Sequence, residues 1–355
     1  MLKEFLSSFG LAVAIFSFVL LMANVFKITD LIINRHVEIR LVMKFLVYNF
    51  SHLLSYVIPM SMLTASLMFF GRISSDHEVV AMKAGGLSLG QILKPFIVLG
   101  LLVSSFLLWF NYTLTPQATY RNLLFLKDLT LQKPTAMLEE RVFNESFDNF
   151  IVYVNKIDGF KLKGVKIWEL KEEGTPRVIT AQQGEFIPSP EKNILVLKLG
   201  QGSIEEVYEK DSVKYHKMDF NNHFIQLSCS RIMDGAAEKR AKDMTYKELK
   251  RKMAELKSKG VDISPLLTEN YQRQALSFAS LPFILVGASL VIKTRRGSRS
   301  FGFGLSLVVF IIYYLLLMLG ETLGRKGLNP FLSMWAANII WGGVGLVMVG
   351  REARM

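Results

Sequence analysis

The sequence contains little cysteine and little charge. Cys229 is the single cysteine among 355 residues, so the chain can form no internal disulfide and no cysteine-based metal site. Charged residues make up 20% of the chain, whereas about 25% is usual in soluble globular proteins. These shortages disfavour a disulfide-stabilised secreted domain, a disordered chain and an ordinary cytosolic enzyme.

Enzyme signatures are also missing from the sequence. It has no Gly-x-x-x-x-Gly-Lys-Ser/Thr phosphate loop and no His-Glu-x-x-His. Its one Gly-x-Ser-x-Gly, at residues 86–90, lies in the loop between two apolar runs and follows no strand-forming segment, so it does not form a nucleophile elbow. The histidines lack the spacing of metal ligands and are His36, His52, His77, His216 and His223. We therefore expect no catalytic residue, no cofactor and no metal site, and any energy from ATP must come from a separate protein.

What the sequence does have is long apolar runs without charge. A membrane-spanning helix needs about 20 predominantly apolar residues, because the hydrocarbon core is roughly 30 Å thick. Only a helix can cross as a single segment, since lipid offers no partner for unpaired backbone groups. Six runs reach that length: 5–26, 45–71, 95–120, 274–292, 300–320 and 327–350. The sequence predicts an α-helical membrane protein with six transmembrane helices, and no Asp, Glu, Lys or Arg inside them.

The distribution of basic residues predicts the orientation of these helices. The net charge of +12 would by itself permit nucleic-acid binding, but the apolar runs remove that interpretation. Cytoplasmic loops carry an excess of Lys and Arg. If the N-terminus is cytoplasmic, the short segments on that side hold ten basic residues and the opposite ones six. We expect a multi-pass protein with both termini cytoplasmic. The first run is longer than a signal-peptide core, so we expect it to be retained.

A block rich in β-forming residues separates the third and fourth runs. Short apolar segments alternate with turn signals such as Asp158-Gly159, which favours a sandwich or a barrel. A helix is expected over 243–259, with Thr245-x-x-Glu248 as a capping box at its start. The predicted domains are 1–120 with helices 1–3 and a cytoplasmic loop at 74–94, 121–268 with the β domain, and 269–355 with helices 4–6.

The loop between the second and third runs has two interpretations. Ser75-x-x-Glu78 fits a capping box, so Glu78 could simply cap a short helix. The helix would also carry Val79, Val80 and Met82, and apolar residues outside the membrane usually meet a partner or the membrane interface.

Basic residues at the opposite membrane boundary are equally open to two interpretations. Lys27 ends the first run, and Arg40, Lys44, Arg325 and Lys326 share the same boundary. A long basic side chain at this depth can snorkel to the headgroups, or it can bind the phosphate of a phosphorylated lipid.

Three motifs resemble one known family along nearly the whole chain. They are the loop 78–86, the arginine-rich turn at 293–299, and the stretch 327–338, placed in the order three spans, β domain, three spans. This combination resembles the LptF/LptG-type permeases of the lipopolysaccharide export ABC transporter, also called the YjgP/YjgQ family. Lys27-x-x-Asp30 looks like the LptG branch, whereas Asn329-Pro330 and Trp335 look like the LptF branch, so the branch stays open.

The resemblance implies a transport subunit whose partners supply what it lacks. It implies a second permease of the same fold, a cytoplasmic ABC ATPase dimer, and a periplasmic β-jellyroll that receives lipopolysaccharide and meets a jellyroll bridge protein. The implied ATPase-coupling residues are Glu78, Val79, Val80, Met82, Gly85 and Gly86. Lys27 matches by position a lysine that contacts lipid A phosphates, and Arg40, Arg325 and Lys326 are further lipid-binding candidates.

Two other functions are compatible with the residues. One is the permease of another lipid or lipoprotein ABC exporter, which would also lack a phosphate loop. The other is a non-transport membrane scaffold whose β domain binds a partner.

Overall fold

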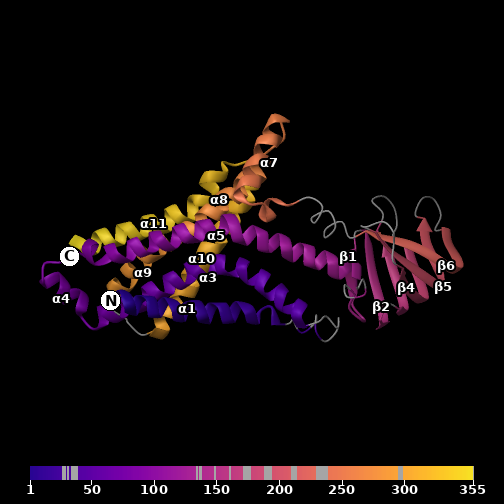
Figure 1. Cartoon of the computed structure of the whole chain (residues 1–355), viewed down its shortest axis with the longest axis horizontal. Helices are drawn as coiled ribbons and strands as arrows, with labels where there is room; N and C mark the ends of the chain where they lie inside the picture. Colours follow the sequence, from indigo (N-terminus) through magenta and orange to yellow (C-terminus); the bar gives the residue numbers. More distant parts are fainter. Residues whose placement is uncertain are drawn as a thin grey trace. The chain divides into compact units, whose positions relative to one another are not determined.

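The computed structural model describes residues 1–25, 29, 32, 39–132, 135, 138–147, 149–159, 161–170, 177–187, 194–208, 214–228, 239–294 and 299–354. The chain divides into two compact units (Figure 1). The first, the helical unit, comprises Met1–Val25, Val47–Thr119 and Arg240–Met355. The second, the β unit, comprises Phe26–Leu46 and Tyr120–Lys239.

The predicted six transmembrane helices are confirmed among the described residues. The candidate spans are Leu2–Met22, Ile39–Ser75, Leu89–Asp128, Ser264–Ile292, Gly302–Arg325 and Pro330–Glu352. They belong to α1 (Leu2–Met22), α3 (Ile39–Ser75), α5 (Leu89–Gln132), α8 (Ser264–Phe278) with α9 (Ser280–Thr294), α10 (Arg299–Arg325) and α11 (Pro330–Arg354). Outside the spans lie α4 (Glu78–Ala84), η3 (Ala241–Asp243) and α7 (Tyr246–Ser258).

The fourth span begins earlier than the charge-free run predicts. It starts at Ser264, so it contains Glu269 and Arg273, both of which are largely buried. The expectation that the spans hold no charged side chain was therefore wrong. Charge alone marks a span end poorly, because a paired and buried ion pair can lie inside a helix that remains apolar overall.

Small residues let the spans approach one another closely. A Cβ added at Gly287 of α9 would lie 2.7 Å from the Ser66 side chain of α3. At Gly320 of α10, a Cβ would collide with the backbone carbonyl of Ser333 in α11. Since hydrophobic burial gives little drive between helices in lipid, such close backbone packing stabilises the bundle instead.

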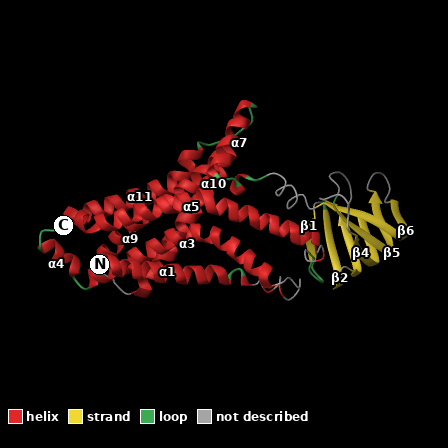
Figure 2. Cartoon of the chain, viewed as in Figure 1, coloured by secondary structure: helices red, strands yellow, loops and turns green. Residues whose placement is uncertain are grey.

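The predicted β domain between the third and fourth spans is confirmed. Its strands are β1 (Phe143–Phe147), β2 (Phe150–Asp158), β3 (Lys161–Glu169), β4 (Arg177–Ile187), β5 (Ile194–Tyr208) and β6 (Lys214–Ser228). Each pairs antiparallel with its neighbours in sequence, and the described strands form one sheet rather than the two packed sheets of a sandwich (Figure 2). This antiparallel sheet is the described part of the predicted jellyroll-like β domain.

The sheet bends so that its apolar side chains share one core. In β3 the buried positions pass from Leu162 to Val165, a spacing of three where a regular strand has two, and β4 shows the same shift. Gly164 in β3 and Gln201 in β5 lie beside these shifts and have positive φ angles of 63° and 46°. The change of alternation keeps apolar side chains on one side in both halves of each strand. The core of the β unit consists of the buried residues Leu138, Phe147, Val152, Val154, Leu162, Val165, Ile167, Ile179, Ala181, Phe186, Leu195, Leu197, Leu199, Ile225 and Leu227.

Candidate functional site

The first candidate site is α4 and the residues that hold it in the helical unit. α3 continues through Ser75, and His77, with a φ of 59°, is the N-cap residue before α4. Ser75 is therefore helical and Glu78 is the first residue of α4. The predicted capping box between Ser75 and Glu78 was wrong, because the helix before it does not end where the motif needs it to.

Arg72 holds the start of α4. Its Nη1 donates to Glu78 Oε1 at 2.9 Å and to Asp76 Oδ2 at 3.1 Å, and its Nη2 donates to Glu4 Oε2 at 2.8 Å. Each of these partly exposed pairs contributes little alone. Together they tie α1, the end of α3 and the start of α4 to one guanidinium. Arg72 was missed in the sequence, although its spacing of four residues from Asp76 was a signal for an ion pair.

The end of α4 is a Schellman motif built on Gly86. The Gly86 N–H donates to Lys83 O at 3.0 Å, and the Leu87 N–H donates to Met82 O at 3.1 Å. Gly86 has a φ of 87°, which side chains disfavour, whereas Gly85 has an ordinary φ of −76°. Of the two glycines predicted as coupling residues, only Gly86 has a backbone conformation that requires glycine.

The C-terminal end of the chain also holds α4. Lys83 Nζ donates to the backbone carbonyl of Glu352, at 2.8 Å, in α11. In Figure 1, α4, the N-terminus and the end of α11 lie at the same end of the helical unit. Displacement of α4 therefore acts on α1, α3 and α11 together.

The apolar residues of α4 divide between packing and exposure. Val79 is 4% exposed and belongs to a buried cluster that Met82 packs against, whereas Val80 is 58% exposed. A pocket of about 240 Å³ opens beside them. Its lining is mostly apolar and consists of Met1, Leu2, Met82, Leu87, Gln91, Ile92, Pro95 and Phe96. Val80, the half-exposed Leu87 and this pocket are the surfaces available to a partner.

The four predicted lipid-binding residues are not described as one site. Lys27 lies outside the described residues, and Arg40 belongs to the β unit, where it is exposed. Arg325 and Lys326 are neighbours at the end of α10. Arg325 Nη2 pairs with Glu321 Oε1 at 2.7 Å, and Gln272 Nε2 donates to the other carboxylate oxygen at 3.1 Å. Lys326 is exposed and has no side-chain partner within the part of the chain that the structure describes.

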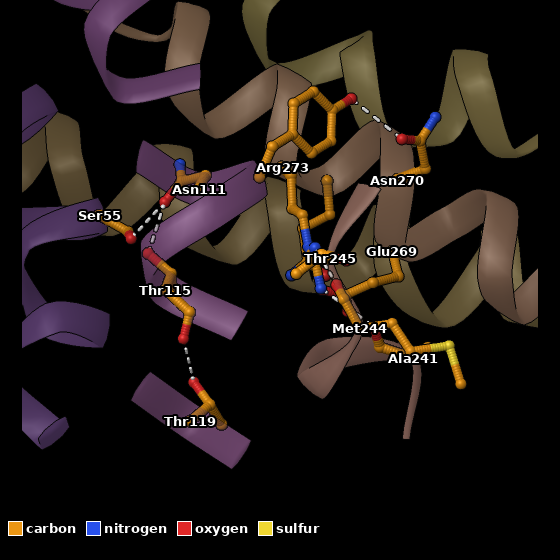
Figure 3. Close-up of polar contacts among 12 residues, drawn as sticks. Ser55, Asn111, Thr115, Thr119, Ala241, Met244, Thr245, Glu269, Asn270 and Arg273 are labelled. Atoms are coloured by element: carbon orange, nitrogen blue, oxygen red, sulfur yellow. Dashed lines mark hydrogen bonds and ion pairs between the residues drawn. The ribbon is translucent and has the colours of Figure 1, made fainter. Parts of the chain in front are cut away.

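Arg273 forms a second polar centre (Figure 3). The sequence analysis did not predict this centre. Its Nε donates to Glu269 Oε1 at 2.9 Å within α8. Its Nη1 donates to Met244 O at 2.7 Å and its Nη2 to Ala241 O at 3.0 Å. The Arg273 and Glu269 side chains are only 8% and 12% exposed. Arg273 thus fixes the segment after the β domain onto the fourth span.

Neutral hydrogen bonds join the spans next to this centre. Ser55 of α3 donates to Asn111 Oδ1 of α5 (Figure 3), and Asn111 Nδ2 donates to Ser277 Oγ of α8 at 3.0 Å. Tyr112 of α5 donates its hydroxyl to Asn270 Oδ1 of α8 at 2.9 Å. Such bonds between spans are each worth about 0.6–2 kcal/mol. These bonds fix the positions of α3, α5 and α8 relative to one another, which apolar contacts alone would specify poorly.

None of these groups is arranged for catalysis or metal binding. Within the described ranges, no group of three or more His, Cys, Asp or Glu side chains could hold a metal ion. Arg72, Lys83, Arg273 and Arg325 instead pair with carboxylates or with backbone carbonyls. These contacts link α1, α3, α4, α8 and α11 to their neighbours.

Comparison with known proteins gives one match over almost the whole chain. The family model described as "Lipopolysaccharide export system permease LptF/LptG" matches residues 1–351. A search of curated proteins finds no match.

Proposed function

We propose that this chain, which belongs to the LptF/LptG family of lipopolysaccharide export permeases, extracts lipopolysaccharide from the inner membrane and passes it to a periplasmic bridge toward the outer membrane. Members of this family are permease subunits of a transporter and not enzymes. The observation that carries the proposal is the anchoring of α4. A short helix outside the spans is tied to three of them, and the sequence has no phosphate loop of its own.

A cytoplasmic ABC ATPase dimer supplies the energy in this proposal. The ATPase contacts exposed Val80 and Leu87, with Glu78 at the edge of the contact. Val79, Met82 and Gly86 support the surface from behind by packing and by the Schellman turn. Motion of the ATPase then reaches α1 and α3 through Arg72 and α11 through Lys83. The N- and C-termini and α4 are on the cytoplasmic side, and the β domain is periplasmic.

A second permease of the same fold completes the lipid pathway. In α3 and in the fourth span, 72% of the most apolar stretch of the helix is buried within the chain. The corresponding buried shares in α1, α10 and α11 are only 17%, 28% and 22%. The exposed apolar faces of these three spans can meet lipid tails or another permease. Lipopolysaccharide enters laterally between the two permeases. Lys27, Arg40, Arg325 and Lys326 are its proposed phosphate contacts.

The β domain is the proposed exit for the lipid. Its edge strands, β1 and β6, suit pairing with a periplasmic jellyroll bridge protein.

The experiment is purification of the tagged chain in mild detergent, with its protein and lipid partners identified by mass spectrometry. A cytoplasmic ATPase, a second six-span permease and bound lipopolysaccharide are expected. An ATPase with a lipoprotein or another lipid would favour a different exporter, and a complex without any ATPase would favour a scaffold.

Substitution of the coupling helix tests the mechanism itself. Glu78→Ala is expected to lower lipid export at least several-fold while insertion and the purified complex stay intact. Glu145→Ala, an exposed carboxylate of the β unit, is the matched control. Export at the natural rate in Glu78→Ala would remove Glu78 from the coupling role.

A further inference from the structure

The feature left unexplained by transport is α7, the helix between the β domain and the fourth span. It runs from Tyr246 to Ser258, and α8 begins only six residues later, at Ser264. Since α8 is part of a span, the C-terminal end of α7 must lie close to a membrane surface. Figure 2 shows α7 projecting sideways from the other helices of the helical unit.

The N-terminal end of α7 is firmly attached. The predicted capping box is confirmed: the Thr245 N–H donates to Glu248 Oε2 at 2.8 Å, and both parts of the motif are present. Leu249 is fully buried, and the Tyr246 ring lies 4.8 Å from the Tyr112 ring, centroid to centroid. The direction of α7 is therefore set by packing at its start.

The two long flanks of α7 differ in charge. Glu255 pairs with Lys259 at 2.6 Å and with Lys252 at 4.0 Å, on the flank that also carries Glu248. The Lys259 hydrogen bond, followed by the Lys252 charge, lowers the pKa of Glu255. On this flank, acidic and basic side chains alternate and neutralise each other.

The opposite flank carries only basic charge. We name Lys247, Lys250, Arg251 and Lys257 the basic stripe, because spacings of three, four and ten residues place them on one face of a helix. All four are exposed, and Lys247, Lys250 and Lys257 form no hydrogen bond or ion pair with another residue in the described part of the chain. Arg251 lies at the edge of the stripe, where its charge also helps to lower the pKa of Glu255. Ala254, also exposed, lies in the middle of this stripe.

We propose that the basic stripe of α7 binds the phosphates of anionic lipid headgroups, so that α7 lies on the membrane surface beside the bundle. Three observations favour a lipid surface over a protein as the occupant. The short connection to α8 places the helix at headgroup height, α7 projects sideways to where the bilayer lies, and the stripe has no acidic residue. A cluster of Lys and Arg next to a membrane span is typical of segments that bind anionic lipid headgroups.

The test uses the full chain in lipid nanodiscs. Cys229 is replaced by serine, Ala254→Cys is labelled with a fluorophore, and quenching by headgroup-labelled lipid is measured. Strong quenching is expected in discs that contain phosphatidylglycerol. It should weaken in pure phosphatidylcholine and in high salt, because surface charge is screened. Each basic residue near an anionic surface contributes about a fivefold factor in binding, so Lys247, Lys250 and Arg251→Gln should weaken the contact roughly a hundredfold.

Two control variants separate charge from folding. Lys161, Lys163 and Lys166→Gln removes three exposed charges from the β unit and should leave the quenching unchanged. Lys247 and Lys250→Arg keeps the charge and should also leave it unchanged. Quenching that is absent in anionic discs, or that is equal in neutral discs and insensitive to salt, would overturn the proposal. A protein occupant would be indicated if quenching is absent but a permease partner protects the label. Lipid export is not read in this test, so its result is independent of the proposed transport function.

Discussion

Loss of the Arg273 side chain is expected to destabilise the helical unit strongly. In Arg273→Ala, Glu269 would remain 12% exposed without its cation, and the carbonyls of Met244 and Ala241 would lose their donors. Removing one partner of a buried ion pair costs about 3–5 kcal/mol, because the remaining charge stays desolvated. The free energy of unfolding should fall by about that amount. A lysine at position 273 cannot serve all three acceptors in the planar arrangement of a guanidinium, so Arg273→Lys should restore only part of it.

The assay is unfolding of the purified chain in mixed micelles with increasing denaturing detergent. Arg273→Met combined with Glu269→Gln removes both charges and should be more stable than Arg273→Ala, since no buried charge is left alone. Lys259→Ala removes one partner of an exposed ion pair and should cause little change. If Arg273→Ala were no more destabilising than Lys259→Ala, the argument that a buried ion pair fixes the segment after the β domain would be refuted. A double variant less stable than Arg273→Ala would refute the desolvation argument.

Two further predictions concern a glycine and a histidine. Gly86→Ala should destabilise the end of α4 by about 1 kcal/mol, because a side chain disfavours its φ of 87°, whereas Gly85→Ala should not. Hydrogen exchange of the Leu87 amide measures the difference. Equal protection of this amide in both variants would contradict the prediction. Burial, and then the charge of Arg177, lower the pKa of His223 in β6, so the folded state disfavours its protonation and stability should fall as the pH drops below about 6.5. His223→Gln should reduce the loss of thermal stability between pH 8 and pH 5, and an unchanged pH dependence would exclude His223 as its source.

The same sequence motif had opposite outcomes at two places. Thr245-x-x-Glu248 forms the predicted capping box, since the preceding residue Met244 is extended and a helix can start there. Ser75-x-x-Glu78 does not, because α3 propagates through Ser75 before the chain turns at His77. A capping motif only permits a helix start, and whether it is used depends on the helix before it.

The number of spans, the inserted β domain and the family resemblance could all be read from the sequence. Hydropathy over about 20 residues is a property of each segment by itself, and so is the alternation that marks strands. The positions of charged side chains could not be read in this way. Arg72 meets Glu4 across 68 residues and Arg273 meets Ala241 across 32, and neither pair has a local signal. Only the tertiary structure decided which charges are neutralised, which lie buried, and which, like the basic stripe of α7, are left exposed. The physical reason is that charge pairing depends on distance in space, whereas burial in a membrane depends mainly on the composition of each segment.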